Sequence, residues 1–350
     1  MSRLSAPAGE PVSEAPERDR KAEHIRLALD RRMQVQANFF DEYYFEHQAL
    51  PEIDLAEIDL STTFLGRKLS APLLISCMTG GTDEATRINR NLALAAEQSG
   101  IAVGVGSQRK AIEDPTLAES FRVRSLAPSV PLLANLGAVQ LNYGFGLEEC
   151  RAAVEMIEAD ALVFHLNPLQ EAIQPEGQCD FSGLVSKMGE VARRLEVPVI
   201  VKEIGCGISA RLARALQAEG IDMVDCAGVG GTSWARIEAR RASDLEIGEL
   251  FADWGIPTPL CLRELRQIPG LTLIGSGGVR NGIEVAKAIA MGAVLAGVAQ
   301  PYMAAAHESA EKAVAKAERI VRELRIAMFC LGVRSLDELR RVELRRRWEG

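Results

Sequence analysis

Residues 161–171 read Ala-Leu-Val-Phe-His-Leu-Asn-Pro-Leu-Gln-Glu, and this stretch decides the fold class. The run from Ala161 to Leu166 shows no alternation of polar and apolar residues, so a strand here is buried on both faces, as strands of parallel sheets are. Polar residues follow where the strand ends. Residues 199–205, Val-Ile-Val-Lys-Glu-Ile-Gly, repeat this design. Apolar strands with polar carboxyl ends are typical of α/β folds, whose ligand sites lie at those ends.

Working outward, the same kind of run recurs along the chain and alternates with amphipathic helical stretches such as 84–99, 147–159, 181–195, 210–219 and 282–291. Eight strand–helix units predict a (β/α)8 TIM barrel, whereas a doubly wound open sheet seldom needs eight equivalent units. The predicted strands are Leu73–Cys77, Ala102–Gly106, Leu132–Leu136, Ala161–Leu166, Val199–Glu203, Met223–Ala227, Leu271–Gly275 and Val294–Val298.

The segments outside this pattern predict the domain organisation. Residues 1–18 lack a hydrophobic period and predict a disordered tail, followed by a helical extension from about Arg18 to Met33. Residues 230–269 are too long for a plain connection and predict an inserted helix or two after the sixth strand. We therefore expect one barrel domain over residues 19–350, with its N-terminal helix near the mouth.

Composition narrows the class of protein. The 350 residues are 47% hydrophobic and 25% charged, and 40 basic against 48 acidic residues give a net charge of −8, which disfavours nucleic acid as a partner. The seven cysteines form no C-x-x-C pair, so we expect reduced thiols and a cytoplasmic location. We find no signal sequence, and no apolar stretch approaches a membrane span, so we expect no membrane partner.

The seventh and eighth strand ends predict a phosphate site. Ser276-Gly277-Gly278 precedes a helix, and Ala296-Gly297 ends the next strand. Glycine lets backbone N–H groups approach an anion closely, and a helix amino terminus adds partial positive charge. The alternative is a glycine-rich barrel turn that binds no ligand.

Lys202 follows a strongly apolar strand and predicts a flavin partner. A cation at the barrel mouth stabilises negative charge on a reduced isoalloxazine ring, and the amide of Asn135 and the hydroxyl of Thr79 suit the polar edge of that ring. The alternative for Lys202 is a structural ion pair with Glu203, and Asn135 and Thr79 could each simply form a turn.

Other polar residues at the mouth suit a metal and an anionic substrate. Glu171 offers the oxygen ligand that Mg²⁺ prefers, although it could equally begin an exposed helix. His165 is either a site residue or a packed histidine. Arg20, Lys21 and His24 lie within about one helical turn and suit a diphosphate, although a solvated helix face would look the same.

Taken together, the motifs resemble the type 2 isopentenyl-diphosphate delta-isomerases from Arg20 to about Leu336. Each block alone is weak, but their joint order is specific. The only departure is Cys226, where a serine or another small residue is expected. The matching blocks are Arg20-Lys21-x-x-His24, Met78-Thr79-Gly80-Gly81, Val105-Gly106-Ser107-Gln108-Arg109, Asn135-Leu136-Gly137-Ala138, His165-Leu166-Asn167-x-x-Gln170-Glu171, Val201-Lys202-Glu203-x-Gly205, Gly230-Gly231-Thr232-Ser233-Trp234 and Trp254-Gly255-Ile256-Pro257-Thr258.

The resemblance implies a barrel that converts isopentenyl diphosphate to dimethylallyl diphosphate in isoprenoid biosynthesis. It also implies reduced FMN as acid and base, NADPH as reductant, Mg²⁺ held by Glu171, and a homotetramer or homo-octamer. Proton chemistry is assigned mainly to FMN, with Gln170 and His165 assisting. On this basis the substrate contacts are Arg20, Lys21, His24, Ser107, Arg109, Asn167 and Gln170. The FMN contacts are Cys77, Met78, Thr79, Ser107, Asn135, Lys202, Thr232, Gly277, Gly278, Val279, Arg280, Ala296 and Gly297.

Two other classes of protein remain as alternatives. A 2-hydroxy-acid oxidase on the same barrel would need a histidine and arginines for a carboxylate, and no H-x-x-R pattern follows the seventh strand. A barrel that only binds phosphate ligands would be isolated colourless and would not take up FMN.

Overall fold

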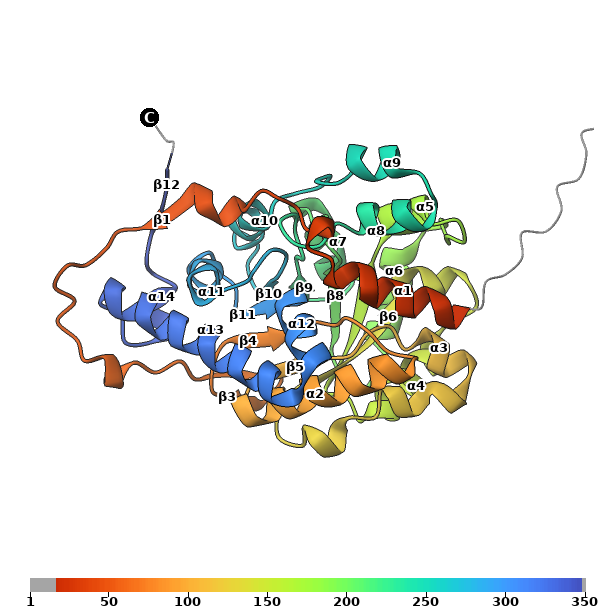
Figure 1. Ribbon diagram of the computed structural model, residues 1–350, viewed down its shortest axis with the longest axis horizontal. Helices are drawn as coiled ribbons and strands as arrows, with labels where there is room; N and C mark the ends of the chain where they lie inside the picture. Colours follow the sequence, from red (N-terminus) through yellow and green to blue (C-terminus); the bar gives the residue numbers. More distant parts are fainter. Residues whose placement is uncertain (1–16, 348–350) are drawn as a thin grey trace, which may run out of the picture.

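A closed barrel of eight parallel strands forms the centre of the computed structural model, which describes residues 17–347 (Figure 1). Each strand pairs with its neighbours in sequence, and β11 closes the ring by pairing with β4. The predicted barrel is thus confirmed, and the open sheet is excluded. The strands are β4 (Leu73–Ile75), β5 (Ala102–Gly104), β6 (Leu132–Gly137), β7 (Ala161–Leu166), β8 (Val199–Glu203), β9 (Met223–Asp225), β10 (Thr272–Gly275) and β11 (Leu295–Val298).

Helices cover the outside of the barrel and bury their apolar faces against it. In α2 (Asp83–Ser99), the side chain of Thr82 accepts the backbone N–H of Ala85, and Gly100 ends the helix in the left-handed conformation with φ 62°. The other covering helices are α4 (Leu147–Ile157), α6 (Leu184–Ala192), α7 (Ala210–Ala218), α10 (Thr258–Leu265), α11 (Gly282–Ala290) and α13 (Ala310–Leu331).

A short hairpin closes the barrel at the amino ends of its strands. It consists of β2 (Thr62–Phe64) and β3 (Arg67–Leu69), which pair antiparallel. Phe64 and Leu69 pack with apolar side chains from the barrel interior, including Leu74. Because this end is plugged by side chains, ligands have access only from the carboxyl ends of the strands.

The predicted insertion after the sixth strand is present. It contains α8 (Trp234–Arg241) and α9 (Leu245–Leu250), which precede the covering helix α10. The N-terminal helix α1 (Glu17–Leu29) contacts α8 and α12 (Gln300–Glu308) at the mouth (Figure 1). It ends four residues before the predicted Met33, because the Asp30 carboxylate accepts the N–H of Arg32 and starts a 3₁₀ turn. The tail predicted over residues 1–18 lies almost wholly outside the described residues.

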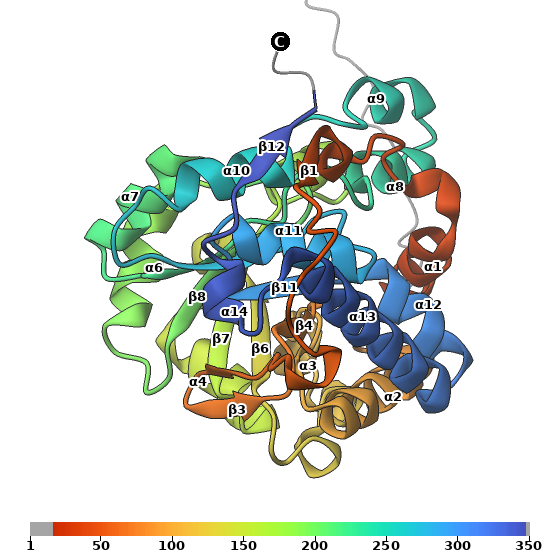
Figure 2. The same ribbon diagram turned by 90° about the vertical axis from the view of Figure 1, so that its left-hand side faces the viewer.

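Several short elements complete the chain. Strands β1 (Tyr43–Phe45) and β12 (Leu344–Arg346) lie side by side as an antiparallel pair (Figure 2). Within residues 17–347, no helix combines the length and the apolar character that crossing a membrane requires. The remaining helices are α3 (Arg109–Glu113), α5 (Pro168–Ile173) and α14 (Leu336–Leu339), and the 3₁₀ turns are η1 (Arg31–Met33), η2 (Phe39–Glu42), η3 (Leu55–Glu57), η4 (Pro115–Ser120), η5 (Arg124–Leu126) and η6 (Ala138–Asn142).

Candidate active site

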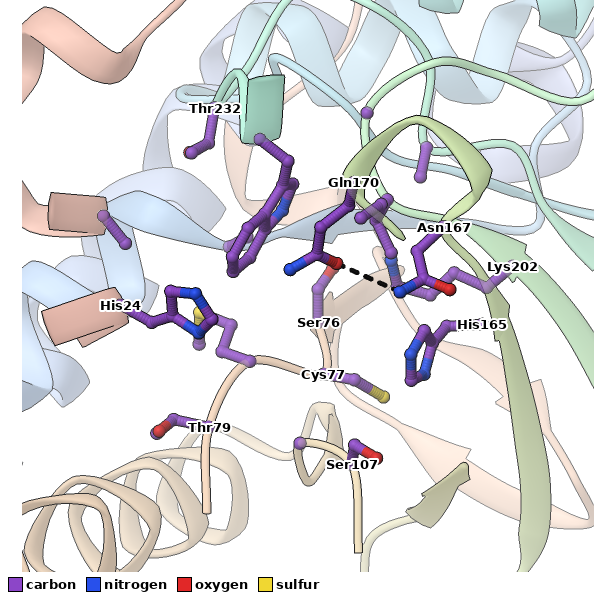
Figure 3. Close-up of a pocket in the computed structure, with 18 of the residues that line it drawn as sticks. His24, Ser76, Cys77, Thr79, Ser107, His165, Asn167, Gln170, Lys202 and Thr232 are labelled. Carbon is purple, nitrogen blue, oxygen red and sulfur yellow. Dashed lines mark hydrogen bonds between the residues drawn. The ribbon is translucent and has the colours of Figure 1, made fainter. Parts of the chain in front are cut away.

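A pocket opens at the carboxyl ends of the barrel strands and is lined on one side by residues of α1, among them His24 (Figure 3). It brings together nearly every residue that the sequence singled out. The exception is Ala296, which is buried within β11 and does not line the pocket, although the next residue does. The predicted site residues that line it are Arg20, Lys21, His24, Cys77, Met78, Thr79, Ser107, Arg109, Asn135, His165, Asn167, Gln170, Glu171, Lys202, Thr232, Gly277, Gly278, Val279, Arg280 and Gly297.

One end of the pocket is a glycine cradle between the β9–α8 and β10–α11 loops. Gly277 and Gly278 have φ of +97° and +79°, and a Cβ on Gly277 would lie 2.1 Å from the carbonyl oxygen of Gly228. Arg280 holds the two loops together by donating to the carbonyl oxygens of Gly278, at 2.7 Å, and Gly230. The amino terminus of α12 lies at the same end of the pocket. Closely approaching backbone and a helix amino terminus fit the phosphate of a nucleotide such as FMN.

Lys202 lies in the floor of the pocket and is only 8% exposed. Its Nζ donates to the backbone carbonyl of Glu203 at 2.6 Å. The Glu203 carboxylate instead accepts backbone N–H groups of the following turn, including those of Ile204 and Gly205. Among the described residues, the side chains of Lys202 and Glu203 therefore form no ion pair with each other. The ammonium group of Lys202 is available to a ligand in the pocket.

His165 is held as a neutral ring beside Lys202. Its Nδ1 lies 2.8 Å from Oδ1 of Asn135, so Nδ1 carries the hydrogen and Nε2 is the free acceptor. Burial, together with the positive charges of Lys202 and Arg109, lowers the pKa of His165 from its usual 6.5 to about 3. At neutral pH the ring can therefore accept or orient a hydrogen bond, but it holds no proton on Nε2 to donate.

Glu171 is a buried carboxylate at the edge of the pocket. Its oxygens accept from Nδ2 of Asn167 at 2.7 Å, from the N–H of Gln178 at 2.7 Å and from Nε2 of Gln174. Oδ1 of Asn167 is buried without a hydrogen-bond partner. No group of three or more His, Cys, Asp or Glu side chains is arranged for a metal within residues 17–347. One carboxylate near an unsatisfied amide oxygen fits Mg²⁺ that completes its shell with water and substrate phosphate.

Gln170 is oriented by two neighbours. Its Oε1 accepts from Nδ2 of Asn167 at 3.1 Å (Figure 3), and its Nε2 donates to Oε1 of Glu238 at 2.7 Å. The amide is therefore held in one orientation at the wall of the pocket, which suits a residue that positions a substrate.

Glu238 is a site residue that the sequence analysis missed. Its side chain is fully buried on α8, and its oxygens lie 2.9 Å from Nε2 of His24 and 2.6 Å from Nη1 of Arg241. Burial raises the pKa of Glu238, but hydrogen bonds from His24, Gln170 and Arg241 outweigh it and leave the pKa below its usual value. The edge of the His24 ring packs against Trp234 with centroids 5.3 Å apart. This cluster fixes α1 over the mouth.

Glu176 joins the loop after α5 to the same cluster. Its Oε1 lies 2.9 Å from Nη2 of Arg241 and 3.3 Å from Nη1 of Arg20. On the opposite side of α1, the Nζ of Lys21 lies 5.5 Å from the ring centroid of Phe121, within cation–π range. Two cations of α1 are thereby held at the pocket, Arg20 by Glu176 and Lys21 beside Phe121.

Comparisons with known proteins agree with this site. Residues 176–346 match a family model described as FMN-dependent dehydrogenase. A mandelate oxidase mutant with the monooxide FMN adduct superposes with a TM-score of 0.62 at 18% identity, covering 93% of this chain and 92% of that chain. Mandelate oxidase with benzoyl-formic acid gives a TM-score of 0.61 at 18% identity, covering 93% and 90%. At this identity the two structures show the fold alone.

Curated relatives are much more similar in sequence. The isopentenyl-diphosphate delta-isomerase of Nostoc sp. is 50% identical over 327 residues, covering 92% of this chain and 93% of the relative. The protein of the same name from Paracoccus zeaxanthinifaciens is 51% identical over 334 residues, covering 92% and 95%. Because this identity extends over more than nine-tenths of the chain, the protein belongs to the family of isopentenyl-diphosphate delta-isomerases.

Proposed function

We propose that this chain isomerises isopentenyl diphosphate to dimethylallyl diphosphate in isoprenoid biosynthesis, with reduced FMN, Mg²⁺ and NADPH as the initial reductant. The observation that carries the proposal is the pairing of two anion sites in one pocket. The glycine cradle around Gly277 suits the FMN phosphate, while Arg20, Lys21 and Glu171, which line the same pocket, suit a metal-bound diphosphate. Between them, Lys202, Asn135 and His165 surround the place for a flavin ring.

FMN, when bound and reduced, supplies an electron-rich ring that can exchange protons with an alkene and can stabilise positive charge beside it. The protein residues hold and orient the two molecules. Lys202 places a cation against the ring, and the amides of Asn135 and Gln170 are fixed by their hydrogen bonds to His165 and Glu238. Binding of the diphosphate orients the five-carbon group attached to it. The binding energy of the diphosphate, which does not react, therefore helps to place the alkene, which does.

His165 serves this chemistry as a neutral hydrogen-bonding group. Its low pKa argues against a role as the acid, and its contact with Asn135 supports a role in positioning that amide. Gln170, which is wedged between Asn167 and Glu238, is the residue best placed to orient the alkene or to pass a proton. The seven free cysteines support a reducing, cytoplasmic location, and the family resemblance supports a homotetramer or homo-octamer, which light scattering on the purified chain would test.

The deciding experiment is anaerobic. Purified protein is mixed with FMN, NADPH, Mg²⁺ and isopentenyl diphosphate in deuterated water, and deuterium in dimethylallyl diphosphate is measured by mass spectrometry. We expect labelled product at constant flavin reduction and without an added electron acceptor. Product formation with FMN omitted or kept oxidised would refute the proposal. Stoichiometric consumption of an acceptor would favour a 2-hydroxy-acid oxidase.

The metal assignment has its own test. Glu171→Ala should raise the Mg²⁺ concentration needed for half-maximal activity and weaken diphosphate binding, because it removes the carboxylate beside the unpaired amide oxygen of Asn167. Glu148→Ala, on the exposed side of α4, is the matched control and should leave the Mg²⁺ dependence as it is. An unchanged Mg²⁺ requirement in Glu171→Ala would show that the metal is held elsewhere.

A further inference from the structure

A row of three titratable side chains crosses the floor of the pocket on neighbouring strands. His165 of β7 pairs in register with Lys202 of β8, and Lys202 pairs in register with Asp225 of β9. Residues at paired positions point to the same side of a sheet. Because His165 and Lys202 point into the pocket, Asp225 faces the barrel interior just beneath it, where it is 1% exposed.

Asp225 is buried, and its pKa lies above its usual value. Its Oδ1 accepts from Oγ of Ser276 at 2.5 Å and from the N–H of Ala227 at 3.3 Å. Burial raises the pKa of Asp225, whereas the charge of Lys202, the Ser276 hydroxyl and the Ala227 N–H oppose the rise. Its Oδ2 is buried and has no hydrogen-bond partner. A negative charge here is compensated mainly by the neighbouring ammonium group.

Ser276 connects Asp225 to the ligand space. It is the first residue after β10, it lines the pocket, and it directly precedes the two glycines of the cradle. A Cβ on Gly297 would lie 2.7 Å from Cβ of Ser276 and 2.8 Å from Oγ of Ser76, whose hydroxyl is also buried without a partner. The floor of the pocket therefore combines a buried carboxyl group, a buried cation and hydroxyl groups, and Asp225 itself does not line the pocket.

We infer that Asp225 is a positioning residue that acts through Lys202, as the ionised counter-charge that lowers the positive potential presented to the FMN ring. The inference rests on the proposed binding of FMN. An uncompensated lysine would stabilise negative charge on the reduced ring and would favour loss of its proton. With Asp225 ionised, the floor is nearly neutral as a whole, so reduced FMN keeps a proton available for the alkene.

The test measures the midpoint potential of bound FMN in the full-length protein, together with the affinity for oxidised FMN by fluorescence quenching. Asp225→Asn removes the charge and keeps the shape. Asp225→Ser is a second neutral variant that can still accept from Ala227, in case the first does not fold. Asp160→Asn is the matched control, because Asp160 is paired with Arg67 and Arg124 just before β7 begins, at the plugged end of the barrel.

We expect both neutral variants to bind reduced FMN about tenfold more tightly relative to oxidised FMN than the wild type does, which raises the two-electron midpoint potential by about 30 mV. Asp160→Asn should leave the potential unchanged. A potential that falls, or that moves no more than in Asp160→Asn, would overturn the inference while leaving the proposed function intact. A wild-type chain that binds no FMN would overturn both.

Discussion

Replacing Glu238 by alanine should release α1 from the barrel mouth. The substitution removes a fully buried carboxylate together with its contacts to His24 at 2.9 Å, Gln170 at 2.7 Å and Arg241 at 2.6 Å. Breaking a buried ion network by removing one member typically costs about 3–5 kcal/mol, because the partner charge is left uncompensated. Here Arg241 keeps Glu176 at 2.9 Å, so we expect the lower end, ~3 kcal/mol.

The assay combines calorimetry with hydrogen exchange. For a chain of this size, ~3 kcal/mol corresponds to a fall in Tm of roughly 4 °C. Amide protection in residues 20–29 should fall more than in the barrel strands, because α1 loses its anchor while the barrel does not. Glu238→Gln keeps the shape and some hydrogen bonds and should cost less, about 1 kcal/mol.

The control is Glu249→Gln on α9. Its exposed carboxylate pairs with Arg236 at 2.8 Å, and such surface pairs contribute about 0–1 kcal/mol. If Glu238→Ala melted like this control and α1 stayed as protected as in the wild type, then Glu238 would not be what holds the helix, and the reasoning would fail.

Three further predictions concern the pocket. The pKa of His165 is about 3 in the folded chain and 6.5 ordinarily, so between these pH values the unfolded chain binds one more proton than the folded chain. The free energy of unfolding should therefore fall as pH drops from 6.5 towards 3. In urea titrations, His165→Gln should remove part of that fall. Gly277→Ala should lose at least tenfold in FMN affinity by fluorescence titration, because φ is +97° and the new Cβ would collide with backbone 2.1 Å away. Arg280→Lys should also weaken FMN binding, because one ammonium group cannot bridge the carbonyls of Gly278 and Gly230 as a guanidinium does; an affinity equal to that of the wild type would contradict this.

The barrel could be predicted from the sequence because its strands are apolar on both faces over most of their length, with polar residues near their carboxyl ends. The predicted ends at Cys77, Gly106 and Ala227 were two residues too long, since pairing stops at β4 Ile75, β5 Gly104 and β9 Asp225. At these points the backbone turns away from the barrel to form the mouth, and an apolar residue that lines a pocket looks the same in sequence as one that continues a strand.

The site was predictable where polar residues lie at the carboxyl end of a strand or just beyond it, as His165, Lys202 and Glu171 do. Glu238 was not, because it lies in Trp-Ala-Arg-Ile-Glu-Ala-Arg-Arg, which reads like a solvated helix with scattered charge. Its burial depends on α1 packing over α8, a contact between residues more than 200 positions apart. The only local indication in the sequence was that Glu238 follows the apolar residue Ile237. Whether Glu238 is buried depends on the long-range packing of α1 against α8.

The pairing of β1 with β12 has a consequence for how the protein is made. Arg346 bonds to Glu42, 304 positions earlier, so the segment that follows α1 is paired with residues translated after the entire barrel. Domains generally begin to fold as they leave the ribosome, amino end first. The part of this chain that emerges before the barrel is thus among the last to be secured, and the enzyme's mouth is completed only once the barrel beneath it exists.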